Sequence, residues 1–249
     1  MIRVALAGHR GRTGAEVALA LQAAPDVEYV GGVGRGDDLQ ALLREARPQA
    51  LVDFTNPDAA LDNALAAVQL GAAPVVGTSG LPTHAVDRLE AAAEQAGVGG
   101  IVAPNFAVGA VVMMWLAERA APFFEAVEVI EAHHAGKLDA PSGTALATAR
   151  RLAAHGRFSY NRPEKVTLGD TRGGEEGGVG VHSLRLPGVV ADQEVLFGLT
   201  GQTLSIAHRT TSRAAFGPGV VLAIRGVVTG PRFYRGLDDL LGLSAPAPA

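Results

Sequence analysis

The segment EAHHAGKLDAPSGTA, residues 131–145, brings together side chains that can move protons or bind anions. His133 and His134 end a run typical of a strand, so their side chains should lie on opposite faces. Lys137 follows four residues after His133, and Ser142 precedes a helical pattern whose first N–H groups lack helical partners and can bind an anion. A proton donor, a cation and an anion site so close together suit the reduction of an anionic substrate.

Two other interpretations of this segment are a plain polar loop and a metal site. The spacing contains no HExxH or comparable ligand pattern, so we expect no bound metal. The chain also has no cysteine, which excludes disulfides, thiolate metal sites, iron–sulfur clusters and cysteine nucleophiles. A dehydrogenase that forms a thioester is therefore excluded.

A second candidate site is GHRGRTG, residues 8–14, with glycines at Gly8, Gly11 and Gly14. A dinucleotide pyrophosphate needs a tight turn, a close backbone approach and a helix amino terminus that faces the phosphates. A plain strand-to-helix turn is the alternative, but the position between the first predicted strand and helix favours a dinucleotide site. The lysine and hydroxyl residue of a Walker motif are missing, which disfavours an NTPase.

The end of the second predicted strand, GGVGRGDD, bears on the choice of coenzyme. The acid that usually binds the ribose of NAD is missing at the tip, where Gly34 and Arg35 stand, and acids come only at Asp37 and Asp38. Arg35 could meet a 2′-phosphate, so we expect NADPH to be accepted at least as well as NADH. A solvated turn arginine is the alternative.

Three further loops follow predicted strands and are candidates to line a nicotinamide site. They are DFTNP at 53–57, GTSG at 77–80 and APNFAVG at 103–109. Ligands of open α/β sheets bind beyond the carboxyl ends of the strands, where these loops should lie.

The first part of the chain alternates between short apolar runs and longer helical patterns. Strands are predicted at 2–7, 28–33, 50–54, 74–77 and 99–103, and helices at 13–23, 38–47, 58–70 and 82–96. This alternation predicts βαβ units and a doubly wound, Rossmann-like parallel sheet. Thr13 and Asn56 are the expected amino-terminal caps of two helices, and Gly71 and Gly97 the expected carboxyl-terminal caps.

The pattern changes after residue 104. Helices are predicted at 108–121 and 144–154, and strands at 126–132, 179–185, 194–197 and 202–209. This predicts an α+β domain with a mostly antiparallel sheet. Helical patterns at 219–228 and 235–241 should return to the first domain before a disordered Pro/Ala tail. We thus expect a dinucleotide-binding domain at 1–104 and 217–249, and a substrate-binding domain at 105–216.

Composition narrows the range of partners. The net charge of −4 gives no basic surface for nucleic acid or anionic membranes. The longest apolar stretch, residues 106–117, is shorter than the roughly 20 residues that cross a bilayer. The amino terminus has no signal-peptide pattern. We expect a soluble, cytoplasmic protein that starts at Met1 and acts on a small molecule.

Taken together, these motifs resemble 4-hydroxy-tetrahydrodipicolinate reductase, long called dihydrodipicolinate reductase, of bacterial lysine and diaminopimelate synthesis. The resemblance rests on the segments quoted above and extends through GGVGVHSLRLPGVVADQEVLF and IAHRTTSRAAFGPGVVLA, nearly end to end. It implies an NAD(P)H-binding Rossmann domain and a substrate domain that forms a homotetramer through its sheet. It also implies hydride delivery to C4 of the cyclic substrate, with the 4-hydroxyl lost as water.

The same resemblance implies roles for single residues. His133 would be the acid/base residue and Lys137 the proton donor, while His134, Lys137, Gly143 and Thr144 would bind the substrate carboxylates. The coenzyme, NADPH or NADH, would contact Gly8, His9, Arg10, Gly11, Arg12, Thr13, Arg35, Phe54, Gly77, Thr78, Ser79, Ala103, Pro104, Asn105 and Phe106. Asp139 and Ser142 should shape the turn and cap the helix. Gly34, in place of the family's frequent acid, and a short loop at 36–49 depart from the pattern.

Two rival functions remain at this level. One is a different NAD(P)-dependent oxidoreductase on the same two-domain plan, although its semialdehyde-dehydrogenase form would need a cysteine. The other is a non-catalytic redox sensor that binds NADPH and a partner protein. A sensor would have no need of the histidine, lysine and helix arrangement.

Overall fold

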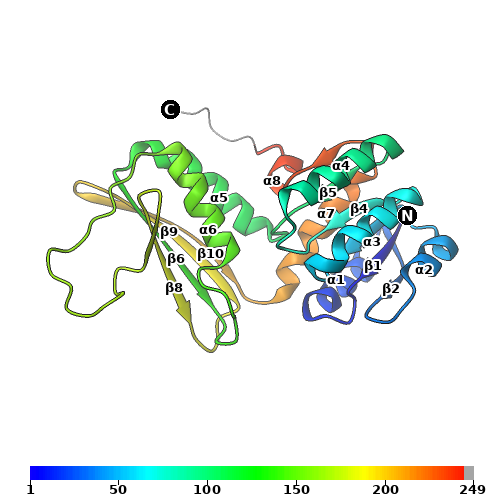
Figure 1. The fold of residues 1–249 in the computed structure, drawn as a ribbon, viewed down its shortest axis with the longest axis horizontal. Coiled ribbons are helices and arrows are strands. Elements are labelled where there is room, and N and C mark those ends of the chain that lie inside the picture. Colours follow the sequence, from blue (N-terminus) through cyan, green and yellow to red (C-terminus); the bar gives the residue numbers. More distant parts are fainter. Residues whose placement is uncertain (244–249) are drawn as a thin grey trace. The chain divides into compact units, whose positions relative to one another are not determined.

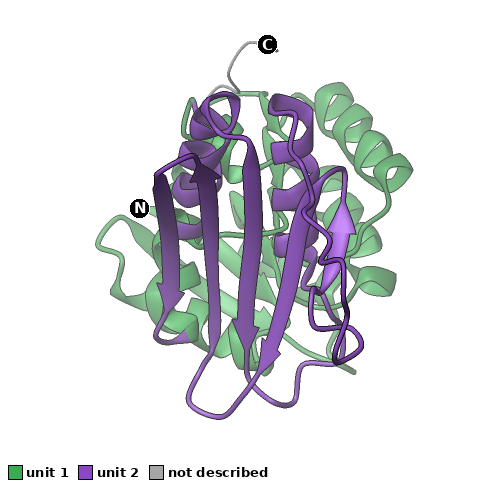
Figure 2. Ribbon diagram, turned by 90° about the vertical axis from the view of Figure 1, so that its left-hand side faces the viewer, with its two compact units in different colours: residues 1–108, 213–242 green, residues 109–212, 243–249 purple. Residues whose placement is uncertain are grey.

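The computed structural model describes residues 1–243, so the expected disordered tail at 244–249 lies outside the described residues. The chain forms two compact units (Figure 2). Unit 1 comprises 1–108 and 213–242, and unit 2 comprises 109–212 with residue 243. The units divide after residues 108 and 212, whereas the sequence predicts boundaries after residues 104 and 216.

Unit 1 is built on a six-stranded parallel sheet with the order β11-β5-β4-β3-β1-β2 (Figure 1). Its strands are β1 (Ile2–Ala7), β2 (Val27–Val33), β3 (Ala50–Asp53), β4 (Ala73–Val76), β5 (Gly100–Val102) and β11 (Phe233–Tyr234). Its helices are α1 (Arg12–Ala23), α2 (Leu39–Ala46), α3 (Pro57–Gln69), α4 (Thr83–Ala96), α7 (Gly217–Val227) and α8 (Leu237–Leu240), with the 3-10 turn η2 (Arg213–Phe216). The predicted doubly wound sheet is confirmed.

The strand order reverses direction beside β1, which has β2 on one side and β3 on the other. The residues of β3 and β4 are all buried, as expected for central strands with helices on both faces. The carboxyl ends of β1 and β3 lie at this reversal, where open α/β sheets bind their ligands.

Two details of unit 1 correct the sequence analysis. Thr13 is not the cap of α1: the extended residue Gly11 precedes the helix, and no side chain caps it. The helix predicted at 235–241 is present but shorter, because only Leu237–Leu240 forms α8. The strand β11, which pairs with β5 at Phe233 and Tyr234, was not predicted. The other caps agree: the Asn56 side chain accepts from the first turn of α3, and Gly71 and Gly97 have positive φ at helix ends.

Unit 2 contains a five-stranded sheet with the order β10-β9-β6-β8-β7. The strands are β6 (Ala126–His133), β7 (Gly174–Glu176), β8 (Val179–Arg185), β9 (Ala191–Leu199) and β10 (Gln202–Thr210). Only the β6–β8 pair is parallel, so the mostly antiparallel sheet is confirmed. Unit 2 also contains the helices α5 (Val108–Ala120) and α6 (Gly143–His155) and the 3-10 turn η1 (Ala121–Phe123). The helices of unit 2 lie behind its sheet in Figure 2. The short β7 was not predicted.

The central strand β6 alternates between a buried and a less buried face. Val127 and Val129 point into the core between the sheet and its helices, and Glu131 follows in the same phase. A carboxylate at a core position must be paired or hydrogen-bonded. His133 follows in the same phase at the end of β6, so this strand positions the candidate acid/base residue directly after the buried core residues.

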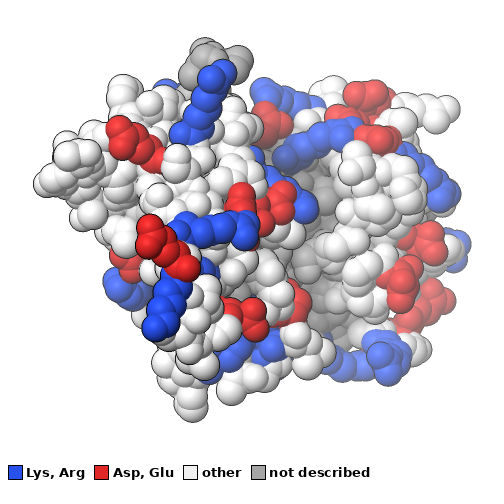
Figure 3. Space-filling view, turned by 60° about the vertical axis from the view of Figure 1, so that its left-hand side comes forward, with Lys and Arg blue, Asp and Glu red and all other residues white. Residues whose placement is uncertain are grey.

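The described surface carries no extended field of one sign on the face drawn in Figure 3, where acidic and basic side chains are intermixed. Within residues 1–243, no helix has the length and apolar character that crossing a membrane requires.

Candidate functional site

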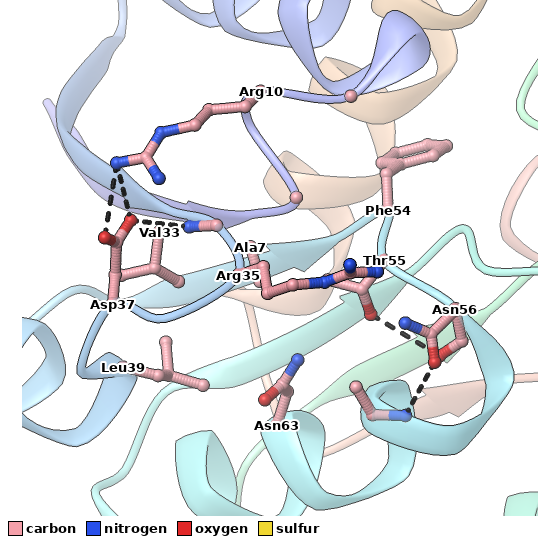
Figure 4. A pocket seen from close by; sticks show the side chains of 14 residues that line it. Ala7, Arg10, Val33, Arg35, Asp37, Leu39, Phe54, Thr55, Asn56 and Asn63 are labelled. Atoms are coloured by element: carbon pink, nitrogen blue, oxygen red, sulfur yellow. Dashed lines mark hydrogen bonds and ion pairs between the residues drawn. The ribbon is translucent and has the colours of Figure 1, made fainter.

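A pocket lies in unit 1 at the carboxyl ends of β1, β2 and β3. Ala7 pairs with Asp53 in the sheet, so the loops that begin at Gly8 and Phe54 leave it side by side. The pocket has a volume of about 380 Å³ (Figure 4). Its lining consists of Ala7, Gly8, Arg10, Gly11, Val33, Gly34, Arg35, Asp37, Leu39, Phe54, Thr55, Asn56, Ala59 and Asn63.

Glycines give this pocket a backbone floor. Gly8 has φ +86°, and a Cβ there would lie 2.4 Å from the Phe54 carbonyl oxygen. A Cβ on Gly14 would lie 2.1 Å from the Gly8 carbonyl oxygen, so only glycine lets α1 start so close to the first loop. Because no side chain caps α1, its first N–H groups are left for a ligand. This cradle fits a pyrophosphate.

Arg10 and Asp37 form an ion pair at the rim of the pocket. The Arg10 guanidinium lies 2.9 Å from one Asp37 oxygen, which also accepts from the Gly34 N–H at 2.8 Å (Figure 4). The Gly34 hydrogen bond lowers the pKa of the Asp37 carboxyl more than burial raises it, and the nearby Arg10 charge lowers it further, so that this pKa lies below its ordinary value. Arg35 also lines the pocket. Two cations and one carboxylate therefore stand where the ribose of an adenosine would be selected.

Asp53 connects two of the predicted loops. Its buried carboxylate accepts from the Thr55 hydroxyl at 2.7 Å and the Thr78 hydroxyl at 2.8 Å through one oxygen. The other oxygen accepts from the Asn63 side chain at 2.8 Å. The loops after β3 and β4 are thus fixed to one acceptor.

The other predicted coenzyme residues are distributed around the same edge of unit 1. Thr78, Ser79 and Pro104 line a separate depression of about 250 Å³. Gly77 lies against the Phe54 ring, which stacks at a tilt on buried Phe106. Three more of the predicted coenzyme residues do not line the first pocket. Ala103 is buried, the Asn105 side chain accepts from the Ala107 N–H, and His9 packs over Gly32. Arg12 and Thr13 begin α1 and are likewise absent from the lining of the first pocket.

The segment 131–145 forms a second site in unit 2. The Nδ1 atom of His133 lies 2.5 Å from one oxygen of Glu131, which is fully buried. Arg185, from β8, binds both oxygens of Glu131 at 2.8 and 2.9 Å. The Ser142 N–H donates to Glu131 at 3.1 Å, immediately before α6. A single carboxylate therefore joins the histidine, an arginine and the start of the helix.

The environment keeps Glu131 ionised. Burial alone would raise the pKa of its carboxyl, but hydrogen bonds from Arg185, Ser183 and His133 outweigh it and hold the pKa below its ordinary value of 4.5. Neither Glu131 nor Arg185 was named as a functional residue from the sequence. The available signal was an acid in the buried phase of β6.

Lys137 lies in the turn between β6 and α6. Its N–H donates to the His134 carbonyl at 3.1 Å, and its ammonium group donates to Asp139 at 2.7 Å. This hydrogen bond, more than the small opposing effect of burial, lowers the pKa of the Asp139 carboxyl. Asp139 therefore pairs with Lys137 within the turn that it was expected to shape, and this pairing was not predicted.

The helix α6 begins at Gly143, and its cap is Ser142. The Ser142 hydroxyl accepts from the Ala145 N–H at 3.1 Å, which confirms the expected cap. A Cβ on Gly143 would meet no atom within 4 Å, so space is open in front of this first turn. The N–H groups of Gly143 and Thr144 have no acceptor within the helix itself. The structure thus brings His133, Lys137 and the α6 amino terminus into one neighbourhood.

Comparison with known proteins gives the family. Residues 2–106 match the model described as "Dihydrodipicolinate reductase, N-terminus", and residues 109–241 match the corresponding "C-terminus" model. The chain belongs to the dihydrodipicolinate reductase family. As a member of this family it is an oxidoreductase with a Rossmann nucleotide-binding domain.

Relatives of the family are similar over almost the whole chain. The 4-hydroxy-tetrahydrodipicolinate reductase of Mycolicibacterium smegmatis is 42% identical, with 98% of this chain and 100% of the relative covered. That of Moorella thermoacetica is 43% identical, with 96% and 98% covered.

Solved structures agree with the assignment to the dihydrodipicolinate reductase family. The dipicolinate-bound dihydrodipicolinate reductase from Paenisporosarcina sp. TG-14 matches with a TM-score of 0.86 and 35% identity, covering 96% of this chain and 99% of that one. An amine dehydrogenase from Mycobacterium smegmatis, at 14% identity, has a TM-score of 0.67 over 95% of both chains and shares only the fold. The reductase function and fold expected from the sequence are confirmed.

In the described residues, no group of three acidic, histidine or cysteine side chains is placed to hold a metal ion.

Proposed function

We propose that this chain catalyses the NAD(P)H-dependent reduction of 4-hydroxy-tetrahydrodipicolinate to tetrahydrodipicolinate, with loss of the 4-hydroxyl as water. The reaction would serve the diaminopimelate route to lysine. The relatives bear the name of this activity, and one similar structure holds dipicolinate, a planar dicarboxylate. We extend these properties to the present chain on the strength of its own site.

The arrangement of His133, Lys137 and the α6 amino terminus is the observation that carries the proposal. The substrate is a dianion, and the first turn of α6 presents N–H groups and the positive end of a helix dipole. Lys137 adds a fixed cation, and His133 adds a ring nitrogen that can exchange a proton. Binding charge and proton transfer are therefore available within one short segment.

The roles follow from these positions. The N–H groups of Gly143 and Thr144, with His134 and Lys137, would hold the substrate carboxylates in register. His133 and Lys137 would supply the proton that neutralises charge on the ring nitrogen or the departing oxygen as C4 is reduced. General acid assistance of this kind contributes roughly 10²–10⁴ in rate.

The coenzyme would be held in unit 1 and would supply a hydride when bound. The glycine cradle of Gly8, Gly11 and Gly14 fits its pyrophosphate, and Arg35 fits a 2′-phosphate. Arg10 and Asp37 would face the adenosine ribose. Thr78, Ser79 and the backbone at 103–106 would contact the nicotinamide half. Both NADPH and NADH are proposed as substrates, with NADPH used at least as well.

A homotetramer formed through the unit 2 sheet is also part of the proposal. The phase of β6 opposite to the core carries Ile130. Leu184, which pairs with Ala132, and Leu196, which pairs with Glu128, lie in the same phase and give this face of the sheet an apolar component. Light scattering coupled to gel filtration measures the mass of the assembly. A tetramer is expected, and a monomer at micromolar concentration would contradict this part.

A coupled assay tests the activity. Dihydrodipicolinate synthase, pyruvate and aspartate semialdehyde generate the substrate, and NADPH or NADH absorbance follows its reduction. Oxidation should depend on both the synthase and this chain. Absence of oxidation with either coenzyme, in a mixture where a known family member is active, would overturn the proposed function.

A further inference from the structure

We propose that Glu131 is a positioning residue that fixes His133 in the tautomer protonated at Nδ1, so that Nε2 is the atom that exchanges a proton with substrate. Arg185 in turn fixes the Glu131 carboxylate, because it donates hydrogen bonds to both of its oxygens. The inference rests on the proposed function for its catalytic consequence. Its structural content, the tautomer of one ring, is independent of any activity.

Hydrogen-bond donors surround the Glu131 side chain. Its carboxylate is fully buried and accepts from two Arg185 nitrogens, from the Ser142 N–H and from the Ser183 side chain. An ionised carboxylate is only an acceptor. The 2.5 Å contact with His133 Nδ1 therefore requires the histidine to be the donor. The shared proton belongs to Nδ1 and leaves Nε2 without one in the neutral ring.

Arg185 makes this arrangement stable in a buried place. A lone carboxylate inside a protein tends to take up a proton, and a protonated Glu131 could instead donate to Nδ1 and reverse the tautomer. The bidentate arginine supplies two charge-assisted hydrogen bonds and removes that option. Arg185 also donates to the Asp139 carbonyl at 2.7 Å, so it holds the Lys137 turn to the same anchor.

Glu131 also links the ring to the anion site. The same oxygen that binds Arg185 at 2.8 Å accepts from the Ser142 N–H at the cap of α6. The position of the imidazole and the start of the helix are therefore set by one rigid group on the central strand. A substrate held at α6 would meet Nε2 in a fixed direction.

The chain contains a matched control on the other face of the same strand. Glu128 also contacts a histidine and an arginine, through His182 Nε2 at 2.6 Å and Arg172. It is partly exposed and lies outside the candidate site. Replacing it removes a similar carboxylate from β6 without touching His133.

Long-range ¹H–¹⁵N NMR of histidine-labelled protein gives the direct test, because the two ring nitrogens have different shifts in each tautomer. In the wild type at a pH where the ring is neutral, His133 should be protonated at Nδ1. In Glu131→Gln, the amide N–H₂ can donate to Nδ1, so this tautomer should lose its dominance. Glu128→Gln should leave the His133 signals unchanged.

Kinetics provide a second readout. Glu131→Gln should lower kcat by at least about tenfold, part of the rate contributed by general acid assistance, while the KM for coenzyme stays within about twofold. Glu131→Asp keeps the charge and should restore part of kcat. Glu128 shares its face of β6 with Ile130, so the mass of the assembly is measured first for Glu128→Gln; where that mass matches the wild type, kcat should stay within about twofold.

The outcomes separate the inference from the proposed function. A wild-type His133 protonated at Nε2 would overturn the inference even if Glu131 variants fail to fold. Full reductase activity in a folded Glu131→Gln protein would also overturn it. A wild type with the expected tautomer but no reductase activity would support the geometric inference and reject the proposed function instead.

Discussion

At the scale of single residues, His133 is the group on which the proposed chemistry depends most. Replacing it in His133→Gln should lower kcat by at least about tenfold, because the proton donor near the reacting ring is lost. The Kd for NADPH should be little changed, since the pocket proposed for the coenzyme belongs to unit 1. Steady-state rates and a binding titration measure both quantities, and near-normal turnover would refute the role of His133.

Arg35 is expected to decide how well the 2′-phosphate of NADPH is bound. Removal of a charge-assisted contact worth roughly 1.5–3 kcal/mol should lower the ratio of kcat/KM for NADPH over NADH by about tenfold or more in Arg35→Ala. The activity with NADH should change little. Measuring kcat/KM with both coenzymes checks this, and an unchanged ratio would show that Arg35 is only a solvated turn residue.

The sequence identified residues more readily when their position followed from the local motif. Ser142 was recognised as a cap because it directly precedes a helical pattern. The sequence predicts no ribose-binding acid at the tip of the second strand, because Asp37 follows the tip by several residues. The turn nevertheless brings the Asp37 carboxylate back to the Gly34 N–H and the Arg10 guanidinium. The partnership of Glu131 with Arg185 depends on the register of β6 with β8, which spans many residues of sequence and has no local signature.

At the scale of elements, the contact between α1 and the first loop depends on Gly14. In Gly14→Ala, the new Cβ would be placed 2.1 Å from the Gly8 carbonyl oxygen and should force α1 away from the loop. The Kd for NADPH should rise by at least about tenfold, because the helix amino terminus would no longer face the pyrophosphate.

Gly230→Ala is the matched control, since a Cβ there meets no atom within 4 Å. Isothermal titration of NADPH into both variants measures the difference. Equal affinities in the two proteins would contradict the role given to the cradle.

The central strand β6 should make unit 2 sensitive to acid through Glu131. The pKa of this carboxyl is lowered from 4.5 in the folded state, so its stabilising effect is full above that value and is lost as pH falls through the folded-state pKa. Breaking a buried pair costs about 3–5 kcal/mol, so Glu131→Gln should be destabilised by roughly that amount at neutral pH.

The difference in unfolding free energy between wild type and Glu131→Gln should shrink below pH 4.5, because a protonated glutamate resembles glutamine. Urea unfolding followed at several pH values measures this difference. A gap that stays constant on acidification would show that the Glu131 charge contributes nothing to stability.

Regular elements were predictable because their burial is periodic. The alternation of strand and helix patterns in unit 1 predicted its parallel sheet. Val127 and Val129, two residues apart, indicated which phase of β6 is buried. Short elements were not. The two residues of β11 are a strand only because they pair with β5, and β7 likewise depends on pairing with β8. The Thr13 prediction failed because Gly11 already has the extended backbone that precedes a helix.

At the scale of the whole molecule, the two units divide the work that a reductase must do. In the proposed function, unit 1 would offer a backbone cradle and cations to a dinucleotide, and unit 2 would offer a histidine, a lysine and a helix amino terminus to a dianion. The chain returns to unit 1 after β10, where α7 and β11 complete the first fold. Within residues 1–243, the groups proposed for the dinucleotide all belong to unit 1 and those proposed for the dianion all belong to unit 2.

The proposed function requires hydride to pass from the nicotinamide to C4 of the substrate, and isotope labelling follows that transfer. The protein would be supplied with enzymatically generated 4-hydroxy-tetrahydrodipicolinate and NADPH deuterated at both C4 positions, and the product analysed by mass spectrometry and NMR. One deuterium is expected at C4 of tetrahydrodipicolinate, and His133→Gln should form this product much more slowly. NADPH oxidation that leaves this product unlabelled would contradict the proposed transfer.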